Sequence, residues 1–138
     1  MKMKHILVGF AASLMFVLPT MADEETPLAK QMEAMNDAYK AMRRETDPAK
    51  GAALAREAQD AMVKAIVETP TLVKDMPDGP EKAKASAEYR KMMGMLIATL
   101  GDMELAFLEG NMDKVKEVVN KMRESKKAGH DKFMEEDE

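Results

Sequence analysis

The sequence offers few side chains that bind metals strongly. It contains no cysteine and two histidines, His5 and His130, and His5 lies in a segment that we expect to be removed on export. A single imidazole without thiols excludes a structural zinc site, a thiol-based active site and a covalent haem attachment. An imidazole and a methionine thioether can still hold the iron of a non-covalent haem from opposite sides. His130 and Met32 are the candidate pair.

The first 22 residues have the features of a secretory signal. A basic start is followed by an apolar run from Ile6 to Leu18, and small residues lead to Ala22 just before Asp23. This pattern predicts cleavage after Ala22 and export to the periplasm. The apolar run is shorter than the roughly 20 residues that a membrane span needs, so we expect no stable membrane insertion. Residues 1–22 are therefore the predicted signal, and residues 23–138 the predicted single domain.

Composition limits the partners and the means of stabilisation. The formal net charge of the chain is −4, and removal of a lysine-containing signal makes the remainder more acidic. An acidic surface argues against nucleic acid or anionic lipid as a partner and is compatible with docking onto a basic protein. Without disulfides, stability must come from core packing or a bound ligand. The 16 methionines and 4% aromatic residues predict a methionine-rich core, which specifies side-chain positions weakly.

Start signals and apolar periodicity predict four helices and no strands. Thr26 and Asp47 each precede a proline, as N-cap residues often do, and Gly110-Asn111 forms a turn between two helices. Residues 70–80 contain three prolines and a glycine, and we expect this connection to hold no regular element. The other connections are short, which forces antiparallel neighbours, so we predict an all-α, up-down-up-down four-helix bundle. The predicted helices span about residues 27–44, 48–68, 80–108 and 112–133.

The periodicity also predicts where the candidate ligands lie. His130 follows Met122, Val119 and Val115 by 8, 11 and 15 residues, which returns it to the same helical face, so we expect its side chain to point inward. Met32 is near the start of the first helix, and His130 is near the end of the last. In an antiparallel bundle these two positions share one end of the molecule. A slot between them could therefore receive a haem.

Such a haem would pack against Met35, Tyr89 and Met93. With both axial positions occupied by protein, the iron has no free position for oxygen or a substrate, which favours electron transfer over catalysis. A thioether ligand also favours ferrous iron, so the reduction potential should lie above that of a bis-histidine haem. We see no hydrolase, kinase or dinucleotide-binding motif and predict that the chain is not an enzyme.

Simpler interpretations of these residues remain open at this point. A histidine near the C-terminus of a helix is more often a solvated or dipole-compensating residue than a metal ligand. A methionine at helical spacing is usually part of the core. Spacing alone therefore leaves haem binding a minority interpretation.

Several short motifs, spread over nearly all of residues 23–138, match the pattern of a known family. They are Met32-Glu33-Ala34-Met35-Asn36-Asp37, Leu28, Thr69-Pro70, Pro77-Asp78-Gly79-Pro80-Glu81, Tyr89-Arg90, Glu109-Gly110 and His130. In these residues the sequence resembles the soluble periplasmic cytochrome b562 family. This resemblance implies that Met32 and His130 are the axial ligands of one non-covalent b-type haem (protohaem IX) per chain. It also implies haem contacts from Tyr89 and, less faithfully, Met93, and an unidentified redox protein as partner.

The sequence departs from the family near the expected haem propionates. Lys126 and Met134 stand one turn before and one turn after His130, where members of the family often carry arginines. Gly129 replaces a larger residue beside the ligand, at a cost of about 1 kcal/mol in helix propensity relative to alanine. These differences could weaken haem affinity without removing the ligands.

Two other functions are compatible with the sequence. The first is a haem-free exported bundle, a binding or chaperone-like protein that has kept the fold. The second is buffering of Cu(I) by thioethers such as Met92, Met93 and Met95, because soft ligands suit this ion. We disfavour the second function because these three positions diverge by about 100° per residue around a helix.

Overall fold

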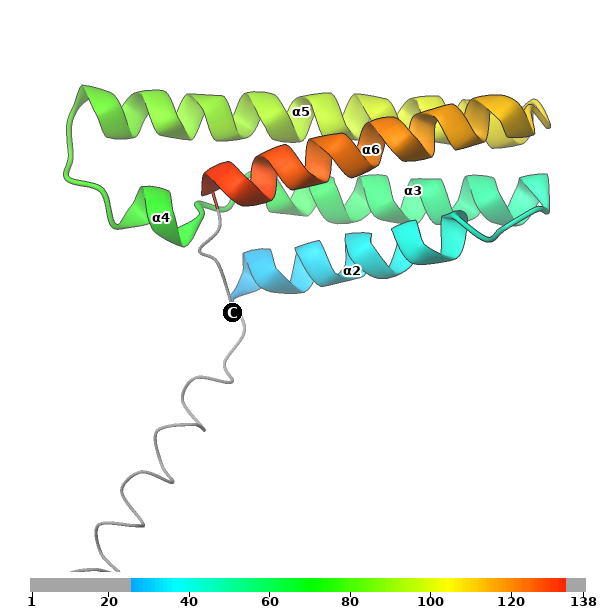
Figure 1. Ribbon diagram of the computed structural model, residues 1–138. Coiled ribbons are helices and arrows are strands. Elements are labelled where there is room, and N and C mark those ends of the chain that lie inside the picture. Colours follow the sequence, from blue (N-terminus) through cyan, green and yellow to red (C-terminus); the bar gives the residue numbers. More distant parts are fainter. Residues whose placement is uncertain (1–25, 134–138) are drawn as a thin grey trace, which may run out of the picture.

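The computed structural model describes residues 26–133, which form an antiparallel bundle of four long helices (Figure 1). The start of α2, the end of α6 and the short α4 lie at the same end of the bundle. No strand occurs in this part of the chain, so the all-α fold class is confirmed. The predicted signal and residues 134–138, which include Met134, lie outside the described residues. The helices are α2 (Pro27–Met42), α3 (Pro48–Ala65), α4 (Thr71–Lys74), α5 (Pro80–Leu108) and α6 (Met112–Phe133).

The predicted capping residues determine where three of the long helices begin. Thr26 Oγ1 accepts a hydrogen bond from the backbone N–H of Ala29 at 3.0 Å, and Asp47 Oδ1 accepts one from that of Ala49 at 2.9 Å. Asn111 caps the start of α6 in the same way, at 3.1 Å. Each of these bonds satisfies an N–H group that has no partner within its own helix. The helix starts were therefore readable from the sequence.

The structure corrects three expectations about the connections. The first helix ends at Met42 and the second at Ala65, each about one turn or less before the predicted end. The segment 70–80 holds α4, although we expected no regular element there. The prolines lie outside α4, and Pro70 accepts a hydrogen bond from the N–H of Lys74 at 2.9 Å, which closes a helical turn. Val73 is 2% exposed, so burial of its side chain favours this extra turn.

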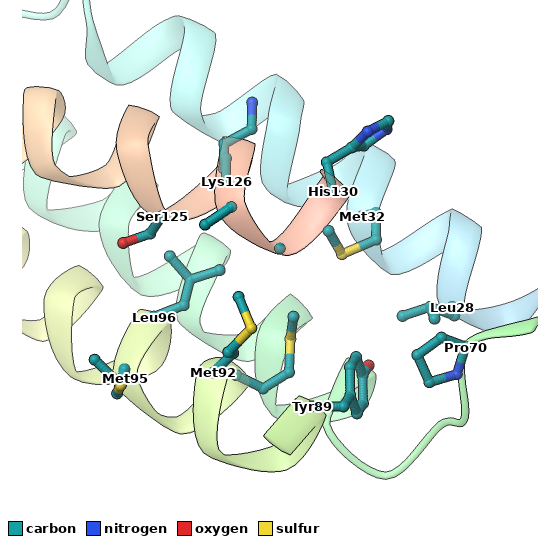
Figure 2. Close-up of a pocket in the computed structure, with 13 residues that line it drawn as sticks. Leu28, Met32, Pro70, Tyr89, Met92, Met95, Leu96, Ser125, Lys126 and His130 are labelled. Atoms are coloured by element: carbon teal, nitrogen blue, oxygen red, sulfur yellow. The ribbon is translucent and has the colours of Figure 1, made fainter. Parts of the chain in front are cut away.

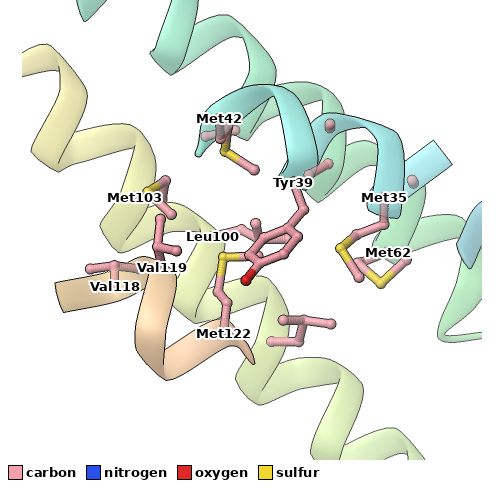
Figure 3. Packing of buried hydrophobic residues seen from close by; sticks show 14 of the residues in the cluster. Met35, Tyr39, Met42, Met62, Leu100, Met103, Val118, Val119 and Met122 are labelled. Carbon is pink, nitrogen blue, oxygen red and sulfur yellow. The ribbon is translucent and has the colours of Figure 1, made fainter. Parts of the chain in front are cut away.

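Methionine supplies most of the large, fully buried side chains of the core, in line with the composition. Figure 3 shows Tyr39 of α2 surrounded by buried side chains of the neighbouring helices. Helix α3 contributes mainly alanines to this core, which lets its neighbours approach closely. None of the helices between residues 26 and 133 is long and apolar enough to cross a membrane. The fully buried methionines are Met35, Met42, Met62, Met103 and Met122.

The four long helices do not pack equally. Helix α3 lies against both α2 and α5, and α5 lies against α6, but no Cα atom of α2 comes within 8 Å of a Cα atom of α6. Side chains alone bridge this seam between the first and last helices. The seam is therefore the part of the bundle that can widen with the least loss of packing, and the candidate site lies at one end of it.

Candidate functional site

A cavity of about 190 Å³ lies at the end of the bundle where α2 begins and α6 ends (Figure 2). Helices α2, α5 and α6 all contribute to its wall, and most of the lining side chains are apolar. Helices α5 and α6 contribute five lining residues each, and α2 contributes two. The lining residues are Leu28, Met32, Pro70, Tyr89, Met92, Met93, Met95, Leu96, Ser125, Lys126, Ala128, Gly129 and His130.

Both candidate iron ligands line this cavity, from opposite sides of the seam. Met32 belongs to α2 and is half-buried, whereas His130 belongs to the last turn of α6 and is exposed. Figure 2 shows the imidazole turned outward, away from Tyr89. This differs from the expectation that His130 points into the core. Helical phase placed its backbone at the cavity, but the backbones of α2 and α6 do not pack closely, and the His130 side chain is exposed.

Tyr89 and Met93 lie in the wall that α5 provides, as the sequence suggested. Both side chains are buried. The Tyr89 hydroxyl donates a hydrogen bond of 2.6 Å to the backbone carbonyl oxygen of Ala65, at the end of α3. This bond fixes the ring against the end of α3 and satisfies a buried polar group. The cavity wall is thus rigid on the α5 side.

Met35, which the sequence predicts to contact a haem, does not line the cavity. Its side chain is fully buried in the core, and Figure 3 shows it beside that of Met62 of α3. Residues three positions apart lie about 60° apart around a helix axis, so they share a broad face but can contact different neighbouring helices. Met32 therefore faces the seam, while Met35, three residues on, faces α3.

Lys126 brings a positive charge to the opening of the cavity. Its ammonium lies 4.6 Å from the centroid of the Tyr39 ring, a cation–π contact that joins α6 to α2 across the seam. Partial burial lowers the pKa of Lys126, and the nearby charges of Lys40 and Arg43 lower it further. These three cations create a positive potential around Tyr39 on the seam between α2 and α6, which suits an anionic group on a ligand.

The sequence interpretation missed how Gly129 and Met92 fit together. A Cβ atom on Gly129 would lie 3.2 Å from Cε of Met92, so the absence of a side chain leaves room for this thioether. Met92, Met93 and Met95 all line the one cavity, although their positions diverge around α5. Of these three, Met93 is buried, whereas Met95 is 60% exposed and lies at the rim of the cavity.

The raised pKa of the buried Tyr89 hydroxyl predicts that the protein loses stability in strongly alkaline solution. Burial and, to a lesser degree, the charge of Glu68 raise the pKa of this hydroxyl to about 12. The resulting stabilisation is complete below the unfolded-state pKa of about 10 and is lost as the pH rises from about 10 toward 12. We expect the urea midpoint to fall in this interval, and to fall less for Tyr89→Phe. An identical alkaline profile for the variant would contradict this assignment.

Comparison with known families gives an independent indication. The family model for cytochrome b562 matches residues 27–134, which include every long helix and both candidate ligands. No curated protein sequence matches the chain. The matched range also includes all of the residues that line the cavity.

Proposed function

The chain belongs to the cytochrome b562 family, and on that premise we propose that it transfers electrons in the periplasm with one b-type haem held between Met32 and His130. The family consists of electron carriers and not of enzymes, which agrees with the prediction from the sequence. The observation that carries the proposal is that Met32 and His130 line one apolar cavity from opposite helices. The protein partner that would receive or donate the electron is an unidentified redox protein.

The residues present fit a haem in chemical type. A thioether and an imidazole are an established axial pair, and bound haem would supply one-electron redox chemistry. Apolar side chains suit the porphyrin, and the cation of Lys126 suits its propionates. The cavity of about 190 Å³ is small against the roughly 300–1,000 Å³ of ordinary ligand sites. Binding therefore requires the seam between α2 and α6 to widen and the His130 ring to turn inward.

The side chains of this chain would set the properties of the bound state. Met32 and His130 would occupy both axial positions and so leave no position for a substrate. Buried Tyr89 and Met93 would exclude water from one side of the cavity. The thioether of Met32 favours ferrous iron, so the potential should lie above that of a bis-histidine site.

A second candidate is a haem-free binding or chaperone-like bundle. The outward imidazole of His130 and the small cavity favour it, because both fit a fold that has kept its shape without the cofactor. The two candidates differ in how haem affects stability. A ligand that binds only the native state must raise stability, by about 2.7 kcal/mol at a free concentration of 100 Kd.

Haem titration of the chain from residue 23 onward decides between them. The electron-transfer proposal predicts saturation at one haem per chain, a low-spin six-coordinate spectrum and a higher melting temperature. If added haem does not bind and the melting temperature does not change, the electron-transfer proposal is rejected in favour of the haem-free candidate. Serum albumin is a suitable control for haem that binds apolar surface without axial ligation by this pair.

Export is a separate part of the proposal. We propose that the signal is removed after Ala22 and that residues 23–138 act in the periplasm, supported by the basic start and apolar run of the first 22 residues. N-terminal sequencing of protein from the periplasmic fraction tests it. Recovery of the intact N-terminus would contradict cleavage.

A further inference from the structure

We propose that the cavity is also a copper site, in which the thioether sulfurs of Met92 and Met93, with Met32 across the cavity, bind one Cu(I) ion when haem is absent. This function is distinct from electron transfer and does not depend on haem binding. The ion enters and leaves as Cu(I), so no oxidation or reduction is involved.

Methionine sulfurs are concentrated around this cavity. Four methionines from two helices line the cavity: Met32 from α2, and Met92, Met93 and Met95 from α5. They differ in depth, since Met93 is 7% exposed, Met32 and Met92 are half-buried, and Met95 is 60% exposed. Thioethers therefore extend from the rim to the wall of the cavity. This arrangement offers an entering ion a sulfur ligand at each depth.

The methionine thioethers around the cavity are selective for Cu(I). Thioethers are soft, neutral donors, and soft donors select Cu(I) over hard divalent ions. No group of three or more histidine, aspartate or glutamate residues able to hold a metal occurs among residues 26–133. The sequence also lacks cysteine. The thioether donors around the cavity therefore suit a soft ion such as Cu(I).

Lys126 and His130 are the charged residue and the nitrogen donor that line the cavity. Lys126 lines the cavity, but Figure 2 shows its ammonium directed away from Met92, and this ammonium lies over the ring of Tyr39. The cation therefore does not occupy the space between the sulfurs. His130 is exposed at the rim, and a turn of its side chain could add an imidazole nitrogen, a ligand that copper also accepts.

The volume of the cavity suits a single ion better than a haem. A single ion fits a cavity of about 190 Å³ without any movement of the helices, whereas a haem requires the seam to widen. The two occupants would share Met32 and the space beside His130. They would therefore exclude each other, so that a chain loaded with haem could not hold copper in this cavity.

The experiment is a competition titration under anaerobic conditions. The haem-free chain from residue 23 onward competes with bicinchoninate for Cu(I), and the proposal predicts one bound ion per chain. The double variant Met92→Leu/Met93→Leu should lose affinity by at least about tenfold, because even outer-shell changes at metal sites cost about 10–100-fold. Leucine keeps the volume of methionine, so circular dichroism should report an intact fold.

The matched control is Met103→Leu/Met122→Leu, which removes two fully buried core methionines outside the cavity. It should bind Cu(I) as the unaltered chain does. Equal losses in both double variants, or no competition by the unaltered chain, would overturn the proposal. A copper X-ray absorption spectrum with sulfur neighbours supports it, and one with only nitrogen or oxygen neighbours overturns it. Because all samples are haem-free, a failure of haem binding leaves these outcomes unaffected.

Discussion

Replacing His130 by alanine is expected to abolish the six-coordinate low-spin spectrum of the haem-loaded chain. Alanine has no donor atom, so the iron would keep at most the thioether of Met32 from this pair and would become high-spin. We expect haem affinity to fall by more than about tenfold, because removing a metal ligand should cost at least as much as disturbing its outer shell. Absorption spectroscopy during haem titration measures both effects.

The exposure of His130 makes this test specific to binding. An exposed side chain in the last turn of a helix contributes little to folding, so the apo-protein should melt at nearly the same temperature with alanine at this position. Met32→Leu should also convert the low-spin spectrum to a high-spin one. The control Met42→Leu changes a core methionine of the same helix outside the cavity and should leave the spectrum low-spin. An unchanged spectrum in His130→Ala would place the ligand elsewhere and refute the proposed pair.

Local sequence signals determined most of the fold. The caps Thr26, Asp47 and Asn111, each with a side chain that accepts a backbone hydrogen bond, marked helix starts within a residue. Gly110, with φ of 68°, closed the preceding helix as predicted. These interactions involve residues within a few positions of one another, so the sequence contains all that they require.

Features that depend on distant neighbours were less predictable. The turn of α4 exists because Val73 has a core to enter, and the composition of residues 70–80 gave no indication of it. Similarly, helical phase brought His130 to the cavity but could not show that the seam beside it lacks close backbone packing. Met35 does not line the cavity, because its side chain packs into the core against the neighbouring helices. Side-chain direction at a seam is thus a tertiary property.

Gly51 provides a case in which local propensity and packing predict opposite results. It lies in the first turns of α3 and is buried against the ring of Phe107 on α5, which is itself fully buried. Helix propensity alone predicts that Gly51→Ala stabilises the protein by about 1 kcal/mol. A Cβ atom at this position would, however, overlap ring atoms of Phe107. Because the ring has no free space to enter, we expect a net destabilisation of about 1–3 kcal/mol.

Urea unfolding of the chain from residue 23 onward measures this effect, and two further variants isolate its cause. Gly94 is exposed on α5 with open space where a Cβ atom would lie, so Gly94→Ala should raise stability by about 0.5–1 kcal/mol. Phe107→Leu removes the overlapping ring, so Gly51→Ala should cost less in that background than in the unaltered chain. If Gly51→Ala instead stabilises the protein as Gly94→Ala does, this result would contradict the close packing of Gly51 in α3 against Phe107 in α5. The packing would then have to be loose enough at Phe107 to admit a methyl group, which would remove the steric reason for a glycine in α3.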